Sequence, residues 1–430
     1  MLKIGPVHRF FVAGCLLISL LAHDGCANHT PESSATASPR SAVILIPGYY
    51  GTKLSRTTDG KLMWLSVGQA LGNGVPLTLP LDDLGLDGPL VRPDEILREI
   101  PIVPWLYHID GYGALLKTFQ EAGLTVVSMD YDWRDDLMRA VRHLDETVVN
   151  LKRRGIDRIA LVAHSMGGLI ASYYLRYGAQ EIQTATETWK GANEVRTVVL
   201  AGVPFDGSMA TFRNMIYGRP IGLNDTLLNF EAVSSFPASY YVLPRADSDR
   251  LLTPNGTERQ GLIGDASNWA RYQWGLLRDK DGLAPDVGNK RLAYTVRWLE
   301  IAGRFHDLVN RPSTHDRAAG CSLMSIVGIG TSTLAKGRLN DHATGRSSVR
   351  FDDGVSSRQA GVQENSVFED GDGTVTRRAS VPPDAYAKRL ALNGRTYEAT
   401  HIDLMNRKDI RRDILNFVVE GLALTPASER

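Results

Sequence analysis

Short runs of hydrophobic, β-branched residues recur along the chain, separated by more polar segments. Five of them predict strands, at residues 42–47, 124–129, 158–163, 195–200 and 323–328. Because both faces of each run are apolar, we expect the strands to lie buried in a parallel sheet.

Helical periodicity fills the intervals between these runs. Apolar residues recur three and four positions apart along residues 137–153, and a second helical pattern follows residue 165. A third spans about residues 407–422. Strands that alternate with helices predict an α/β fold, with a mostly parallel central sheet and helices on both of its faces.

Two stretches break this alternation. Residues 58–110 are rich in proline and glycine, and residues 207–320 contain many aromatic side chains but no clear strand. A structureless loop of that length is implausible in a compact domain. We therefore expect a lid-like insertion at 58–110 and a cap insertion at 207–320, with the core at 41–206 and 321–430.

The first forty residues carry a targeting pattern. Lys3 and Arg9 precede an apolar run at 10–22 that is too short for a membrane span but suits a secretory signal. The polar residues 28–40 are typical of a disordered tether. The pattern predicts a signal segment at 1–27 and export to the periplasm, cell envelope or extracellular space.

The chain has three cysteines, too few for a disulfide scaffold. Cys15 lies in the predicted signal, and Cys321 is expected in the core. Cys26 stands where a bacterial lipoprotein would be lipidated, although His23 and Asp24 depart from that pattern. A lipid anchor through Cys26 is therefore left open.

Charge and motif content exclude several classes of function. Lys+Arg and Asp+Glu both number 48, so no basic excess indicates a nucleic-acid partner. The sequence has no His/Cys cluster with metal-ligand spacing, no phosphate loop and no dinucleotide fingerprint. We therefore predict neither a metal nor a cofactor.

Ser165 stands where a buried strand gives way to a helix, within LVAHSMGGL at 161–169. This is the context of a nucleophile elbow, in which small residues flank a serine on a tight turn. Ala163 takes the place of the usual first glycine, and a helix N-cap serine is the structural alternative. His164 points to the opposite face of the strand, so we expect it to pack or form hydrogen bonds rather than act as the base.

A nucleophilic serine needs a base and a group that orients the base, and in this fold the acid and then the histidine follow the serine. Asp372, between two glycines in FEDGDGTV, is the best orienting carboxylate, with Glu369 and Asp370 as rivals. His401 follows a short β-like run and precedes the last helix, so it is the favoured base. The other downstream histidines lie in the cap or in polar loops: His306, His315 and His342.

Two backbone N–H groups are expected to stabilise the oxyanion of an acyl-transfer intermediate. Met166 follows the nucleophile at the start of a helix, where free N–H groups and the helix dipole favour negative charge. The second group is expected from the PGYYG turn at 47–51, after the first strand. An ordinary Pro-Gly turn is the alternative at that place.

Several motifs in order along the chain resemble the lecithin:cholesterol acyltransferase family, which includes lysosomal phospholipase A2 and phospholipid:diacylglycerol acyltransferase. They are VILIPGYYGTKL at 43–54, MWL at 63–65, YDWR at 131–134, LVAHSMGG at 161–168, GVPFDGS at 202–208, GIGTST at 328–333, GDGTV at 371–375 and THID at 400–403. YDWR and GDGTV together are specific, whereas the serine elbow alone indicates only some α/β-hydrolase. The resemblance implies an α/β-hydrolase core with a cap and a lid-like, lipid-binding insertion.

The resemblance also implies roles for residues. Ser165, Asp372 and His401 fall on the family's triad positions, and Tyr50 and Met166 fall on its oxyanion positions. Two features depart from the family. The elbow begins with alanine, and the paired cysteines of the animal members are absent, so the disulfide that closes their lid cannot be assumed.

Further residues are implied around this site. Trp64 would lie in the lipid-engaging insertion, and Tyr49 is grouped with it as a lipid-binding residue. Asp132, Trp133 and Arg134 would be structural supports near the site.

These features predict a serine-dependent lipid acyl-ester hydrolase or O-acyltransferase that acts through an acyl-enzyme. The expected partners are a phospholipid or other lipid ester, a membrane or lipid surface and, for transfer, an acceptor alcohol. The sequence does not decide between hydrolysis and transfer, because both use the same triad. A soluble carboxylesterase or triacylglycerol lipase is the first alternative, and a non-enzymatic lipid-binding surface protein is the second.

Overall fold

The computed structural model of the chain describes residues 41–103, 107–279, 282–315, 320–352 and 366–423. The predicted signal segment, the tether and Cys26 lie outside the described residues. Within the described part of the chain, no helix combines the length and the apolar character needed to cross a bilayer.

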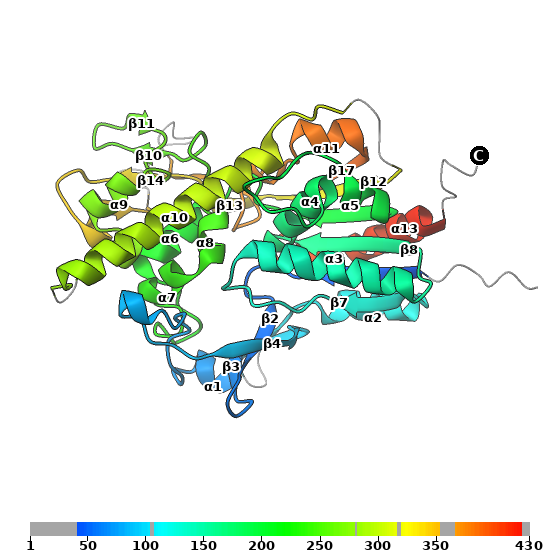
Figure 1. The fold of residues 1–430 in the computed structure, drawn as a ribbon, viewed down its shortest axis with the longest axis horizontal. Helices are drawn as coiled ribbons and strands as arrows, with labels where there is room; N and C mark the ends of the chain where they lie inside the picture. Colours follow the sequence, from blue (N-terminus) through cyan, green and yellow to red (C-terminus); the bar gives the residue numbers. More distant parts are fainter. Residues whose placement is uncertain (1–40, 104–106, 280–281, 316–319, 353–365, 424–430) are drawn as a thin grey trace, which may run out of the picture. The chain divides into compact units, whose positions relative to one another are not determined.

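The centre of the fold is a six-stranded sheet with the spatial order β17-β12-β9-β8-β1-β7, in which every neighbouring pair is parallel (Figure 1). All five predicted apolar runs form strands of this sheet, and the run before His401 supplies the sixth. The strands are β1 (Ser41–Ile46), β7 (Thr125–Ser128), β8 (Arg158–His164), β9 (Thr197–Ala201), β12 (Ser322–Ile329) and β17 (Ala391–Glu398).

Helices cover both faces of this sheet. Alternate residues of β1 separate the two layers, because Ile44 packs in one hydrophobic cluster and Val43 in the other. The cluster of Ile44 includes α3 (Leu137–Arg153) and α4 (Met166–Tyr177), whereas the cluster of Val43 includes α2 (Gly113–Glu121) and α13 (Lys408–Ala423). The predicted α/β architecture is therefore present. The remaining helices of the core are α5 (Lys190–Glu194), α11 (Asp384–Arg389) and α12 (Asp403–Asn406).

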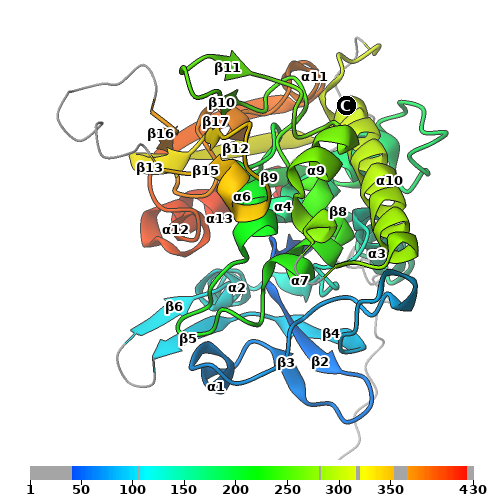
Figure 2. The same ribbon diagram turned by 90° about the vertical axis from the view of Figure 1, so that its left-hand side faces the viewer.

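The chain between β1 and α2 forms two small antiparallel sheets beside the core (Figure 2). In the larger one, β2 lies between β3 and β4, and in the smaller one β5 pairs with β6. The elements are β2 (Thr52–Arg56), β3 (Leu62–Trp64), α1 (Val67–Ala70), the 3₁₀ turn Asp82–Leu84, β4 (Val91–Ile96), β5 (Glu99–Val103) and β6 (Tyr107–Asp110).

Residues 207–320 form a largely helical region. Its helices are α6 (Met209–Tyr217), α7 (Phe230–Ser235), α8 (Pro237–Tyr241), α9 (Ala266–Tyr272), the 3₁₀ turn Gly275–Leu277 and the long α10 (Pro285–Asn310). The expectation that this stretch holds no strand is wrong in detail, because it contains β10 (Leu251–Leu252) and β11 (Glu258–Arg259). Each has only two residues, too few to show an alternating pattern in the sequence.

Two further small sheets contain strands that follow β12. β10 and β11 join β14 (Gly337–Leu339) and β15 (Val349–Arg350), while β13 (Thr331–Leu334) pairs with β16 (Phe368–Gly371). β16 therefore leads directly into the loop that carries Asp372. Two 3₁₀ turns, Gly345–Ser348 and Arg378–Ser380, complete the described elements.

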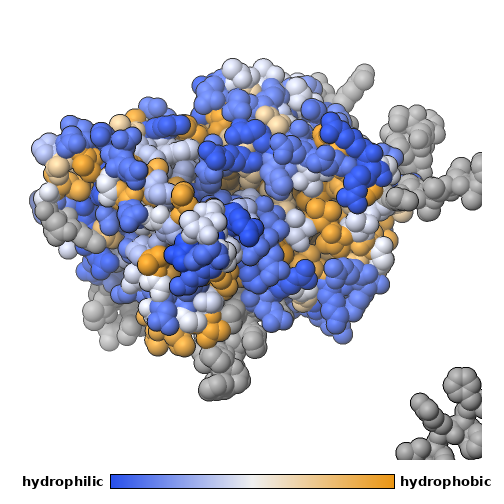
Figure 3. Space-filling model, turned by 60° about the horizontal axis from the view of Figure 1, so that its bottom comes forward, coloured by the Kyte–Doolittle hydropathy of each residue, from blue (hydrophilic) through white to orange (hydrophobic). Residues whose placement is uncertain are grey.

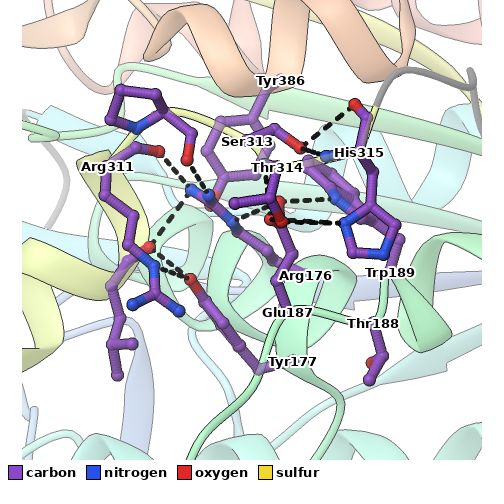
Figure 4. Close-up of polar contacts among 12 residues, drawn as sticks. Arg176, Tyr177, Glu187, Thr188, Trp189, Arg311, Ser313, Thr314, His315 and Tyr386 are labelled. Carbon is purple, nitrogen blue, oxygen red and sulfur yellow. Dashed lines mark hydrogen bonds and ion pairs between the residues drawn. The ribbon is translucent and has the colours of Figure 1, made fainter.

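Arg176, in the last turn of α4, anchors the chain that leaves α10 (Figure 4). Its fully buried guanidinium donates to Glu187 Oε1 at 3.0 Å and to the carbonyl oxygens of Arg311 and Pro312 at 2.6 and 2.8 Å. Glu187 also accepts hydrogen bonds from Trp189 Nε1 at 2.8 Å and from the Thr314 hydroxyl at 2.7 Å. The ion pair therefore fastens the chain after α10 to the end of α4.

Replacing Arg176 with alanine is expected to lower the free energy of unfolding by about 3–5 kcal/mol, because Glu187 would be left buried without its counter-charge. Urea unfolding followed by circular dichroism measures the change. Arg142→Ala is the matched control, since Arg142 forms an exposed pair with Glu181 at 2.8 Å and should cost less than about 1 kcal/mol. Equal costs for the two variants would contradict the anchoring role.

Candidate active site

Ser165 occupies a strained turn between β8 and α4. Its φ of 54° and ψ of −129° lie in a region that non-glycine residues rarely adopt. Its N–H donates to the carbonyl of Ala201 at 2.8 Å, which fixes the turn against β9. The second and third residues after the serine must be glycines, because a Cβ on Gly167 would lie 2.5 Å from the carbonyl oxygen of Pro47 and one on Gly168 would lie 2.0 Å from a methyl of Val203.

Asp372, which is buried, and His401, which is partly buried, form a pair on neighbouring loops. Asp372 follows β16 and His401 follows β17, and Nδ1 of the histidine lies 2.7 Å from Oδ2 of the aspartate. The other carboxylate oxygen accepts the N–H groups of Thr374 and Val375 at 2.9 and 2.7 Å. Burial alone would raise the pKa of Asp372, but His401 and these hydrogen bonds hold that pKa below its usual range. The carboxylate is therefore ionised and can orient the imidazole.

The rival carboxylates have other partners. Glu369 accepts from Arg250 Nη1 at 3.1 Å, and Asp370 accepts from the N–H of Gly330 at 2.7 Å. Among the alternative histidines, His306 is buried within α10 with its Nε2 2.8 Å from the carbonyl oxygen of Tyr241. His315 lies beside Glu187, and His342 is exposed.

His164 is buried between two hydrogen-bond partners. Its Nδ1 lies 2.9 Å from the Tyr112 hydroxyl, and its Nε2 lies 3.0 Å from the carbonyl oxygen of His401. Burial, assisted by the nearby charge of His401, lowers the pKa of His164 to about 3. The ring is therefore neutral at physiological pH and serves in the hydrogen-bond network, as expected from its place before the serine.

The PGYYG turn packs directly against the serine. The N–H of Gly51 donates to the carbonyl of Gly48 at 3.0 Å, and Tyr50 between them has a positive φ of 69°. A Cβ on Gly48 would lie 2.7 Å from Cβ of Ser165, so only glycine allows this approach. On the other side, Met166 is the first residue of α4, where the N–H has no acceptor within the helix. The two predicted oxyanion donors therefore belong to segments that flank Ser165.

Aromatic side chains pack around this turn. The rings of Tyr49 and Tyr50 are stacked 4.1 Å apart, and Trp133 meets the Tyr50 ring edge-on at 4.8 Å. Trp64, on β3, donates from Nε1 to the carbonyl of Tyr50 at 2.8 Å. The Tyr49 hydroxyl lies 2.6 Å from the hydroxyl of Ser239 in the cap.

The YDWR motif ties the insertion to the core. Asp132 and Arg134 form an ion pair at 2.9 Å, and Arg134 Nη1 also donates to the carbonyl of Leu77 at 2.9 Å. Trp133 Nε1 donates to the carbonyl of Thr52 at 2.9 Å. These contacts hold the segment after β1 beside the serine.

One cavity of about 590 Å³ connects these residues. Ser165, Asp372 and His401 line it together with Tyr49, Tyr50 and Trp64. It also reaches Arg219 and Tyr112. The Arg219 guanidinium lies over the Tyr50 ring at 4.6 Å, and Tyr112 immediately precedes α2. Arg219 and Tyr112 could not be recognised in the sequence, because neither lies in a motif with a known chemical role. Among the described residues, no three His, Cys, Asp or Glu side chains are grouped so that they could hold a metal ion.

Comparison with known proteins agrees with the sequence motifs. A model of the lecithin:cholesterol acyltransferase family matches residues 109–268, which include Ser165. An uncharacterised protein of Saccharomyces cerevisiae, YJR098C, is 28% identical over 218 residues, 47% of this chain. This match spans 29% of the yeast protein, so the chain covers less than a third of that relative's length.

Among solved structures, the crystal structure of the Tle4–Tli4 complex contains a chain with a TM-score of 0.52 and 14% identity, over 90% of this chain and 99% of that one. A Bacillus licheniformis lipase, BlEst2, is also similar, with a TM-score of 0.35 and 10% identity over 90% of this chain and 94% of the lipase. The chain has the α/β-hydrolase fold, so the predicted fold class is confirmed. The predicted family resemblance is confirmed over residues 109–268.

Proposed function

From the family match and the cavity around Ser165, we propose that this protein is a serine-dependent lipid acyl-ester hydrolase or O-acyltransferase. One observation carries the proposal. The Asp372–His401 pair and Ser165 come from three separate connections of the sheet, yet they line the same cavity. Nothing in folding requires these three groups to meet.

In the proposed reaction, Ser165 Oγ attacks the ester carbonyl carbon while His401 accepts the hydroxyl proton. Asp372 keeps the proton of the imidazole on Nδ1, so that Nε2 is free to act as the base. The N–H groups of Tyr50 and Met166 stabilise the oxyanion. His401 then protonates the departing alcohol, and the acyl-enzyme passes its acyl group to water or to an acceptor alcohol.

A phospholipid is the favoured substrate, because the cavity offers both apolar walls and a cation. The stacked tyrosines and Trp64 provide surface for acyl chains, and Arg219 presents a guanidinium beside them. A guanidinium favours an anion, and a lipid phosphate diester supplies one.

Replacing Arg219 with glutamine is expected to raise KM for phosphatidylcholine about tenfold, with little effect on a short uncharged ester. One charge-assisted hydrogen bond to phosphate is worth roughly 1.5–3 kcal/mol. Initial rates on both substrates test this. Arg271→Gln is the matched control, because Arg271 also lies over a tyrosine ring, at 5.1 Å from that of Tyr272, but does not line the cavity. An equal loss on both substrates would exclude headgroup recognition.

The proposal includes peripheral binding to a lipid surface. Three large apolar side chains are exposed: Leu71, Val75 and Leu223, with 52, 50 and 81% of their surface accessible. They lie near the cavity in the chain or in space, since the N–H of Leu223 donates to the carbonyl of Ala70, a residue that lines the cavity. Figure 3 views the molecule from the side on which β2, β3 and β4 lie in Figure 1, and shows apolar patches between hydrophilic regions. Export through the signal segment 1–27, with Cys26 as a candidate lipidation site, belongs to the same proposal.

Product analysis tests the function. Residues 28–430 and their Ser165→Ala variant would be incubated with phosphatidylcholine vesicles that contain a sterol or diacylglycerol, and all lipids would be identified by mass spectrometry. Free fatty acid and lysophospholipid, absent with the variant, would indicate hydrolysis, and an acylated acceptor would indicate transfer. Cleavage of a short-chain ester alone would favour the carboxylesterase instead.

A further inference from the structure

Tyr112 joins two segments of the site without lying in any of the motifs. It immediately precedes α2, and its side chain is 4% exposed. Its hydroxyl accepts the N–H of Gly48 at 2.8 Å and lies 2.9 Å from Nδ1 of His164. One hydroxyl group therefore contacts both the turn that carries Tyr50 and the residue before the nucleophile.

His164 continues this chain of hydrogen bonds toward the base. Its Nε2 lies 3.0 Å from the main-chain carbonyl oxygen of His401, and the two imidazole centroids are 4.6 Å apart. The backbone N–H of His401 donates in turn to the carbonyl of Asp372 at 2.8 Å. The backbone of His401 is thus held from two sides, by His164 and by Asp372.

The direction of each hydrogen bond follows from the groups present. The carbonyl of His401 can only accept, so Nε2 of His164 carries the proton. In the neutral ring Nδ1 is then an acceptor, and the Tyr112 hydroxyl donates to it while accepting from Gly48. Each bond has one donor and one acceptor, so the chain Gly48–Tyr112–His164–His401 is fully satisfied although it is buried.

We propose that Tyr112 and His164 are positioning residues that hold the oxyanion turn and the His401 loop in register with Ser165. The inference rests on the proposed function of the site. Both ends of the chain are backbone atoms of segments with proposed catalytic roles, and neither side chain needs to contact the reacting atoms. Such a link matters because a displacement of about 1 Å in a reacting group can cost roughly 10²-fold in rate.

Tyr112→Phe tests the link with the smallest change, because it removes one oxygen and keeps the ring. We expect kcat for 4-nitrophenyl butyrate to fall about tenfold to a hundredfold, while KM changes less than about twofold. The control is Tyr386→Phe, which removes another buried hydroxyl, one that donates to the carbonyl of Ser172 at 3.1 Å. The control should lose comparable thermal stability but keep its kcat.

A double-mutant cycle with His164→Ala separates positioning from simple destabilisation. If the two residues act as one chain, the double variant should lose less kcat than the two single losses combined would predict. His164→Asn provides a second, polar variant in case the alanine variant does not fold. Additive losses, or a wild-type kcat in Tyr112→Phe, would overturn the proposal.

Ser165→Ala, assayed in parallel, distinguishes a failure of the positioning role from a failure of the proposed function. If Ser165→Ala abolishes turnover while Tyr112→Phe and the His164 variants keep it, only the positioning role fails. If Ser165→Ala keeps turnover, the proposed function itself fails.

Discussion

Replacing Ser165 with alanine is expected to lower the turnover of a lipid ester by about 10⁴-fold or more, because no covalent acyl-enzyme can form without the hydroxyl. Fatty acid release from phosphatidylcholine vesicles measures the loss. Ser172→Ala is the matched control, since Ser172 is a fully buried serine on the same helix and does not line the cavity. That variant should turn over substrate at the wild-type rate.

The turnover of Ser165→Ala also decides whether Ser165 is a nucleophile or only a helix N-cap. A serine that served only as a helix cap would cost roughly 1 kcal/mol of stability on replacement and leave chemistry intact. Moreover, the Ser165 side chain forms no capping hydrogen bond to α4. Near-wild-type turnover by Ser165→Ala would therefore contradict the assignment directly.

Replacing Asp372 with asparagine is expected to lower kcat by about 10⁴-fold while KM stays nearly constant. The amide has almost the size of the carboxylate, so the loop should keep its shape. It lacks the negative charge that stabilises the imidazolium, and it can favour the tautomer in which Nε2 carries the proton and cannot act as the base. Steady-state kinetics on a soluble ester measures the effect.

Asp370→Asn is the control for that experiment, because Asp370 is two residues away and accepts from the N–H of Gly330 instead. It should lower kcat less than about threefold, since its side chain anchors a loop and does not line the cavity. A larger loss in Asp370→Asn than in Asp372→Asn would reverse the choice between the two carboxylates.

The central sheet could be predicted from the sequence because its strands are buried on both faces. Residues 42–46 alternate between two hydrophobic clusters, so each of these five positions must be apolar and the run is easily recognised in the sequence. Leu137 to Leu151 carry the opposite signature, an apolar stripe on one side of α3, and the observed helix has the predicted bounds. Buried strands and the buried faces of helices can therefore be predicted from such apolar patterns.

The peripheral strands could not be predicted in the same way. Val349–Arg350 and Glu258–Arg259 pair over two residues each, and the two hairpins are joined through β10 and β14, which are far apart in the chain. Local sequence holds no period at that length. Their existence follows from tertiary packing of the region around β14.

Some residues of the candidate site could likewise be predicted from the sequence, and others could not. Ser165, Asp372 and His401 could be proposed because each sits in a turn after a strand, and the order along the chain matches the fold. Tyr112 could not, since its partners Gly48 and His164 are 64 and 52 residues away and no spacing rule connects them. Contacts of this kind become visible only once the backbone is folded.

Labelling with a fluorophosphonate probe tests the central claim most directly, because the probe reacts with an activated serine whether the acyl group later goes to water or to an acceptor. The labelled protein would be digested and the modified peptide identified by mass spectrometry. We predict one labelled residue, Ser165, no labelling of Ser165→Ala, and reduced labelling of a wild-type sample pre-incubated with substrate vesicles. An unlabelled wild-type protein, or a label on a serine outside the cavity, would contradict it.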